Sequence, residues 1–220
     1  MVRNRFPLTL AAVIGSIALS GCMTTGPIPY AGLSSSEKMK PDGEGRTTKI
    51  PYEYTSEVAW STYDKLILDP VVVYDGGDNQ FGALKASEKS ELAGYMRETF
   101  SQALGKRFDV IKTPAQGRLR ITLTITGAEE TTPVLSLFEH VDIGGILYNG
   151  IQAMRGGQAA FGGSVSYAVE IYDSESGKLL KAYVSKQYPS AMNIRASIGR
   201  LAAAKAGLDI GATDLVAQLR

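Results

Sequence analysis

The sequence has 220 residues, of which 44% are hydrophobic and 20% are charged, and its formal net charge is +1 at pH 7. A chain of this length can bury one substantial core. The nearly neutral charge excludes the strongly basic face that nucleic-acid binding requires.

The first 21 residues have the features of a secretory signal. Arg3 and Arg5 precede a charge-free run from Leu8 to Leu19. In a helix this run rises only about 18 Å, whereas a bilayer core is roughly 30 Å thick. A basic start followed by a short apolar run is typical of a cleaved signal peptide rather than of a membrane-spanning anchor.

The run ends in Leu19-Ser20-Gly21-Cys22, which contains the only cysteine of the chain. These four residues resemble the bacterial lipobox, where the signal is cut before a cysteine whose thiol receives a diacylglyceryl group. The resemblance implies a signal peptide over 1–21 and acyl chains, such as palmitate, on Cys22. Two or three chains anchor a protein stably. Met23 is not the aspartate that retains many such proteins in the inner membrane, so we expect the outer membrane, facing the periplasm. The alternative to acylation is that Cys22 is a free thiol in a secreted protein, available for an intermolecular disulfide.

Cleavage would leave 199 residues with 21 basic and 22 acidic side chains. Residues 22–54 are rich in Gly, Pro, Ser and Lys, which predicts a flexible lipidated tether. Local docking remains possible at Tyr30, Leu33 and Tyr52. A coil of about 30 residues has a mean span near 30 Å, so the domain over 55–220 could stand clear of the lipid.

The first half of this domain predicts two strands and a helix. Tyr63 to Tyr74 is rich in β-branched and aromatic residues, with Pro70 indicating a bulge or an edge. Ser87 is a plausible N-cap for an amphipathic helix that ends near Gly105. A short strand follows at 108–111.

The second half contains the clearest strand, Arg118 to Thr126, which alternates with period two and should bury Leu123 while Thr124 faces the open side. A hairpin is expected over 164–172 and 179–186, and a helix over 194–219. This order predicts an α+β fold: a mostly antiparallel sheet with two main helices packed on one face.

Several of these motifs are shared with a known family. The segments that carry the resemblance are Trp60–Lys65, Leu68–Val71, the strand at 118–126, and Phe161–Ser164 leading into 170–173. Together they resemble a bacterial lipoprotein family known only as a domain of unknown function (DUF3313). The resemblance implies a periplasmic lipoprotein and brings no activity with it. The element order is also similar, more distantly, to the domain of curli-secretion and penicillin-binding-protein-activator lipoproteins, which is an analogy of topology alone.

The chemical inventory does not indicate an enzyme. His140 is the only histidine, and no serine nucleophile elbow or paired carboxylates accompany it. It could carry a proton between Glu139 and Asp142, but a surface polar residue is the simpler interpretation. We therefore expect no catalytic, cofactor-binding or metal-binding residues.

The segment 134–163 separates two well-defined strands and combines large apolar residues with several glycines. It could be a short helix that completes the core, or an exposed surface that docks a partner. The candidate partner-binding residues are Phe138, His140, Ile146, Tyr148 and Ile151. The favoured function is an envelope assembly or scaffold component that binds an envelope protein and is held at the membrane by its lipid. The alternative is a carrier of a hydrophobic ligand with 134–163 as its lid.

Overall fold

A computed structural model describes residues 26–42, 49–111, 117–131, 162–189 and 199–220. The elements in chain order are β1 (Lys40–Pro41), β2 (Tyr52–Thr55), the 3-10 helix η1 (Trp60–Thr62), β3 (Lys65–Leu68), β4 (Val72–Val73), α1 (Ala86–Leu104), β5 (Asp109–Val110), β6 (Arg118–Glu129), β7 (Ser164–Asp173), β8 (Leu179–Gln187) and α3 (Ala202–Gln218).

The strands of the described part form an eight-stranded sheet in the order β1-β2-β8-β7-β6-β3-β5, with β4 also paired to β6. The three long strands β6, β7 and β8 form an antiparallel meander, and β2 continues it on β8. Both β3 and β4 run parallel to β6. The chain between β4 and β6 includes α1, which supplies the long crossover that a parallel pairing needs.

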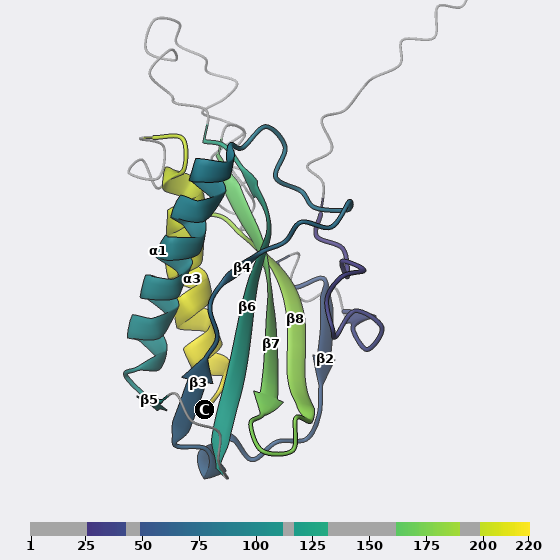
Figure 1. Ribbon diagram of the computed structural model, residues 1–220, viewed down its shortest axis with the longest axis vertical. Helices are drawn as coiled ribbons and strands as arrows, with labels where there is room; N and C mark the ends of the chain where they lie inside the picture. Colours follow the sequence, from purple (N-terminus) through teal and green to yellow (C-terminus); the bar gives the residue numbers. More distant parts are fainter. Residues whose placement is uncertain (1–25, 43–48, 112–116, 132–161, 190–198) are drawn as a thin grey trace, which may run out of the picture.

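Both helices lie on the same side of the sheet (Figure 1). Alternate residues of β6, including Ile121 and Leu123, point toward the helices and are completely buried. From α1, Leu92, Met96 and Phe100 pack into the same core at helical spacing. The predicted α+β fold, mostly antiparallel with two helices on one face, is confirmed.

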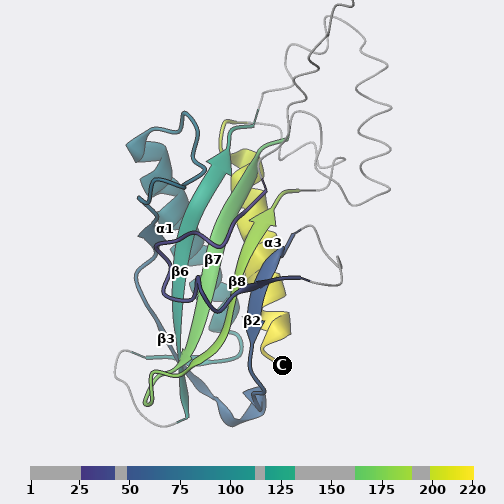
Figure 2. The ribbon, with the colours of Figure 1, turned by 90° about the vertical axis from the view of Figure 1, so that its right-hand side faces the viewer.

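The opposite face of the sheet is also covered. Residues 26–42, which we call the N-terminal strap, cross in front of β6, β7 and β8 (Figure 2). Tyr30 and Leu33 of the strap are buried in a second apolar cluster with Tyr74, Ala168 and Val184. Thr124 was expected on an open face, but its exposure is only 5%. The sheet is therefore the middle layer of three.

The strap is fixed to the sheet by a buried carboxylate. The backbone N–H of Ser35 donates a hydrogen bond of 2.7 Å to Oε1 of Glu170 on β7, and both residues are buried. A charged acceptor makes such a bond stronger than a neutral one. A buried carboxylate is costly unless it accepts hydrogen bonds, so Glu170 is stable only where the strap supplies the Ser35 N–H. This requirement determines where the strap lies on the sheet.

This arrangement differs from the flexible tether expected over 22–54. Of that range, residues 26–42 and 49–54 are described, and they pack against the sheet or, in β2, pair with β8. The docking considered for Tyr30 and Leu33 takes place. The polar composition of the segment suggests a coil, but a few apolar side chains are enough to hold it in place, because the sheet supplies the apolar surface against which they pack.

Two boundaries also differ from the prediction. Helix α1 begins at Ala86, so Ser87 lies inside it, and Lys85 is the N-cap residue. Its backbone N–H donates to the Glu88 carboxylate at 2.8 Å. The single strand expected over 63–74 is divided into β3 and β4, because Pro70 lacks the N–H that would continue the ladder.

Candidate functional site

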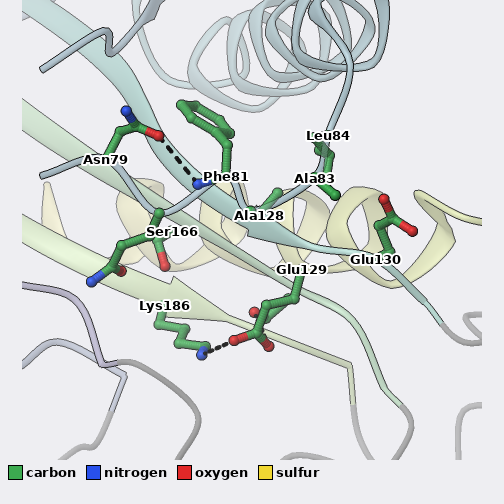
Figure 3. Close-up of a pocket in the computed structure, with 12 residues that line it drawn as sticks. Asn79, Phe81, Ala83, Leu84, Ala128, Glu129, Glu130, Ser166 and Lys186 are labelled. Carbon is green, nitrogen blue, oxygen red and sulfur yellow. Dashed lines mark hydrogen bonds and ion pairs between the residues drawn. The ribbon is translucent and has the colours of Figure 1, made fainter. Parts of the chain in front are cut away.

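A cavity of about 480 Å³ lies at the end of the sheet where β6 ends and β7 begins (Figure 3). Its walls come from the loop after β4, the ends of β6 and β8, and the start of β7. The lining residues are Asn79, Gln80, Phe81, Gly82, Ala83, Leu84, Ala128, Glu129, Glu130, Ser164, Ser166 and Lys186. Polar and charged side chains form one wall, and Phe81, Leu84 and Ala128 connect the other to the core.

The loop over 79–84 is held directly against β6. The backbone N–H of Gln80 donates to Thr126 O at 2.9 Å, and the N–H of Ala128 donates to Gln80 O at 3.2 Å. Between them, the register of β6 with β7 shifts at Gly127. A Cβ on Gly127 would lie 2.7 Å from Gln80 Cβ, so only glycine permits this approach.

An ion pair with a buried lysine crosses three strands on the polar wall. Nζ of Lys186 on β8 lies 2.8 Å from Oε1 of Glu129 on β6, and Oγ of Ser164 on β7 donates to Oε2 of the same carboxylate at 2.9 Å. The Lys186 side chain is 7% exposed, whereas that of Glu129 is 36% exposed. The buried charge of Lys186 depends on the Glu129 carboxylate for compensation. The pair therefore holds β8 and β6 in fixed relative positions at this wall.

The strap reaches the cavity through Gln80. The Tyr30 hydroxyl donates to Oε1 of Gln80, and Nε2 of Gln80 donates to the carbonyl of Gly26, both at 2.9 Å. Burial raises the pKa of Tyr30 above its ordinary value, so this hydroxyl, which is protonated at neutral pH in any case, stays a donor in more alkaline solution as well. The first described residue of the chain is therefore bonded to a residue of the cavity wall.

Arg200 braces the far side of the cavity. Its guanidinium pairs with Glu88 at the start of α1 and with Glu130 at the end of β6. The carbonyl of Arg200 accepts the Thr131 backbone N–H at 2.8 Å, and Thr131 Oγ1 accepts the Ala203 N–H at 3.1 Å. The ends of α1, β6 and α3 are thus connected to one another beside the cavity.

The described residues do not include the site candidates singled out in the sequence. Cys22, Phe138, His140, Ile146, Tyr148 and Ile151 lie outside the described residues. The cavity residues carry little signal in the sequence: Glu129 and Glu130 are neighbouring acids beyond the predicted strand 118–126, and Lys186 is the last residue of the predicted strand 179–186. The usable signal is the acidic pair Glu129-Glu130, which only Gly127 and Ala128 separate from the alternating strand.

Over the described ranges, no group of three or more His, Cys, Asp or Glu side chains is arranged to hold a metal ion. No helix of the same ranges is long and apolar enough to cross a membrane.

The comparison of the sequence with protein families gives a match over residues 29–215 to the family described as "Protein of unknown function (DUF3313)". The chain belongs to this family. The matched range begins inside the strap and ends inside α3, so the family's shared region includes residues 29–42 of the strap, the sheet, α1 and most of α3. No curated protein matches the sequence.

Solved structures that are similar to this chain have low sequence identity to it. The PelC dodecamer of Paraburkholderia phytofirmans is 12% identical with a TM-score of 0.37, covering 76% of this chain and 91% of that one. Protein XCC0632 of Xanthomonas campestris is 10% identical with a TM-score of 0.36, covering 74% and 87%. A protein of Caulobacter crescentus described as a candidate lipoprotein is 15% identical with a TM-score of 0.29, covering 73% and 85%. Similarity at this level supports no statement about activity.

Proposed function

We propose that this family member is a lipid-anchored protein of the cell envelope that binds an envelope protein and has no catalytic activity. The anchor is the acylated Cys22, and the destination is the periplasmic face of the outer membrane. The order Leu19-Ser20-Gly21-Cys22 after a short apolar run supports the anchor. The bound lipid would concentrate the domain at the membrane surface, where its partner is found.

The observation that supports a binding role best is the cavity at the sheet end. Its walls are held by the Lys186–Glu129 ion pair and by the backbone hydrogen bonds between Gln80 and β6, so little ordering entropy is lost when a partner docks. Its mouth includes the exposed Ala83. Fixed walls with several hydrogen-bonding groups suit a polar segment of a protein.

The same lining disfavours the alternative of a carrier for a hydrophobic ligand. An acyl chain in this cavity would lie against Lys186 and Glu129 and would remove their remaining contact with water. The segment considered as a lid, 134–163, lies outside the described residues except for its last two positions.

The proposal is tested by blocking the cavity mouth without disturbing the core. Ala83→Arg places a long charged side chain at the mouth, and Glu175→Arg makes the same kind of change in the exposed turn between β7 and β8. Both variants should keep the parental melting curve, because both positions are exposed. A discrete envelope complex, crosslinked in whole cells, should be lost in Ala83→Arg and retained in Glu175→Arg. Equal complex formation in the two variants would contradict a binding role for the cavity.

The anchor is tested separately by Cys22→Ser. This variant should lack the acyl mass and leave the membrane fraction, measured by mass spectrometry and fractionation. If it remains processed and membrane-bound like the parent, the lipoprotein assignment is wrong. Co-purifying lipid on the parental protein, without any crosslinked protein, would instead favour the carrier.

A further inference from the structure

The strap determines how far the folded domain can move from the N-terminal end of the chain. Its contacts begin at Gly26, whose carbonyl accepts a hydrogen bond from Gln80. They continue at Ala31, whose N–H donates to Asp78 Oδ2 at 3.0 Å, and at Gly32, whose N–H donates to the Tyr74 hydroxyl at 3.0 Å. The strap is therefore part of the folded domain from its first described residues.

Only three residues separate Cys22 from Gly26 in the sequence. Even fully extended, this connection spans about 14 Å. A tether that remained a coil up to residue 54 would instead allow a mean span of about 30 Å. An acylated Cys22 therefore holds Gly26, and with it the loop at Gln80, close to the lipid.

Gly26 lies at one particular end of the molecule. Its partner Gln80 lines the cavity together with Glu129 and Glu130. The end of β6 and the start of β7 meet at the same place: a Cβ on Gly163 would lie 2.8 Å from Thr131 N, and Thr131 N–H donates to Arg200 O. The turn between β7 and β8 is at the opposite end of the sheet, as Figure 1 shows. Strand β7 has 10 residues and so separates the two ends by about 30 Å.

We propose that the cavity end of the domain lies against the headgroup layer of the bilayer that carries the anchor, with the β7–β8 turn pointing away. This inference rests on the proposed acylation of Cys22, and it requires that the partner of the proposed function is itself bound at the membrane surface and enters the cavity at headgroup level. The end in question carries mixed charges, including Lys85, Glu88, Glu130 and Arg200. Such a surface is compatible with hydrated headgroups and too costly to insert into hydrocarbon. The domain thus stands on the membrane and does not enter it.

The experiment uses the lipidated full-length protein in vesicles of phosphatidylethanolamine and phosphatidylglycerol. The acylation consumes the only native thiol, so Ala83→Cys and Glu175→Cys each provide one labelling site. Both positions are exposed, Ala83 at the cavity end and Glu175 in the distant turn. Energy transfer from a dye on each site to an acceptor on the lipid headgroups should be several-fold greater from position 83. Equal transfer from both sites, or greater transfer from 175, would overturn the orientation.

A longer connection provides the matched control. Inserting about 20 Gly and Ser residues between Thr25 and Gly26 adds a flexible span of about 25 Å. The insertion should leave the acyl mass and the melting curve unchanged and should remove most of the difference between the two sites. A difference that survives the insertion would show that the short connection is not its cause and would refute the inference. Absence of acyl mass would overturn the proposed function as well, whereas acyl mass with equal transfer would overturn the orientation alone.

Discussion

Gly127→Ala should destabilise the domain by about 1–3 kcal/mol, the usual cost of overpacking. The new Cβ would lie 2.7 Å from both Cβ and O of Gln80, and 2.9 Å from its carbonyl carbon. Two of these three are backbone atoms, so no side-chain rotation relieves the contact. The loop must move, which weakens its hydrogen bonds to Thr126 and Ala128, each with a net contribution of about 1 kcal/mol.

Gly77→Ala is the matched control, because a Cβ there meets nothing within 4 Å. It should be neutral or stabilising by up to about 1 kcal/mol, since alanine reduces the entropy of the unfolded chain. Urea melts followed by circular dichroism measure both changes. The sign is informative, because strand propensity alone favours alanine over glycine. If Gly127→Ala is as stable as Gly77→Ala, the loop is not packed on β6 as described.

Leu123→Ala should lower the free energy of unfolding by about 2–5 kcal/mol in denaturant melts, because Leu123 is completely buried. Thr124→Asp should also lower it, by more than about 1 kcal/mol, because the strap covers the face of the sheet on which Thr124 lies. If Thr124→Asp left the stability unchanged, the strap would not dock on this face. Glu129→Gln should lower the unfolding free energy by about 1–3 kcal/mol by weakening the contact with buried Lys186, and a melt identical to the parent would argue against the ion pair. Burial, followed by the neighbouring carboxylate on β7, raises the pKa of Tyr172 from 10.0 to about 12. The unfolded chain ionises first, so this contribution to stability is complete below pH 10 and is lost as the pH rises toward 12; Tyr172→Phe should flatten this pH dependence, and an unchanged slope would assign it to another group.

The fold was predictable where side-chain periodicity is strong. The alternation in β6 identified the strand, its buried face and Leu123, and the spacing of Leu92, Met96 and Phe100 identified α1. These signals are local, because the spacing of apolar residues within one strand or helix already shows which of its side chains are buried. The covering of the second face depends on which distant segment reaches it, and residues 26–42 carry too few apolar side chains to reveal that in isolation.

Two kinds of residue could not be interpreted from the sequence, because their role depends on another part of the chain. A glycine inside a helix normally weakens it, but a Cβ on Gly207 would lie 2.8 Å from Gln187 O, so this glycine lets α3 approach β8 closely. Lys186 and Glu129 are 57 residues apart in sequence, and only the register of β6, β7 and β8 brings their charges together. Spacing in the sequence does not encode such a pair.

The strap also has a mechanical consequence. Tension applied to the N-terminal end of the chain enters the fold at Gly26 and is transmitted first to the Gln80 side chain and the Tyr30 packing. These attachments act one after another, so they can detach individually, whereas β7 is held by β6 and β8 through continuous ladders on both sides. Pulling should therefore release the strap before it shears the meander. The released strap would lengthen the connection to the domain while the sheet and both helices remain folded.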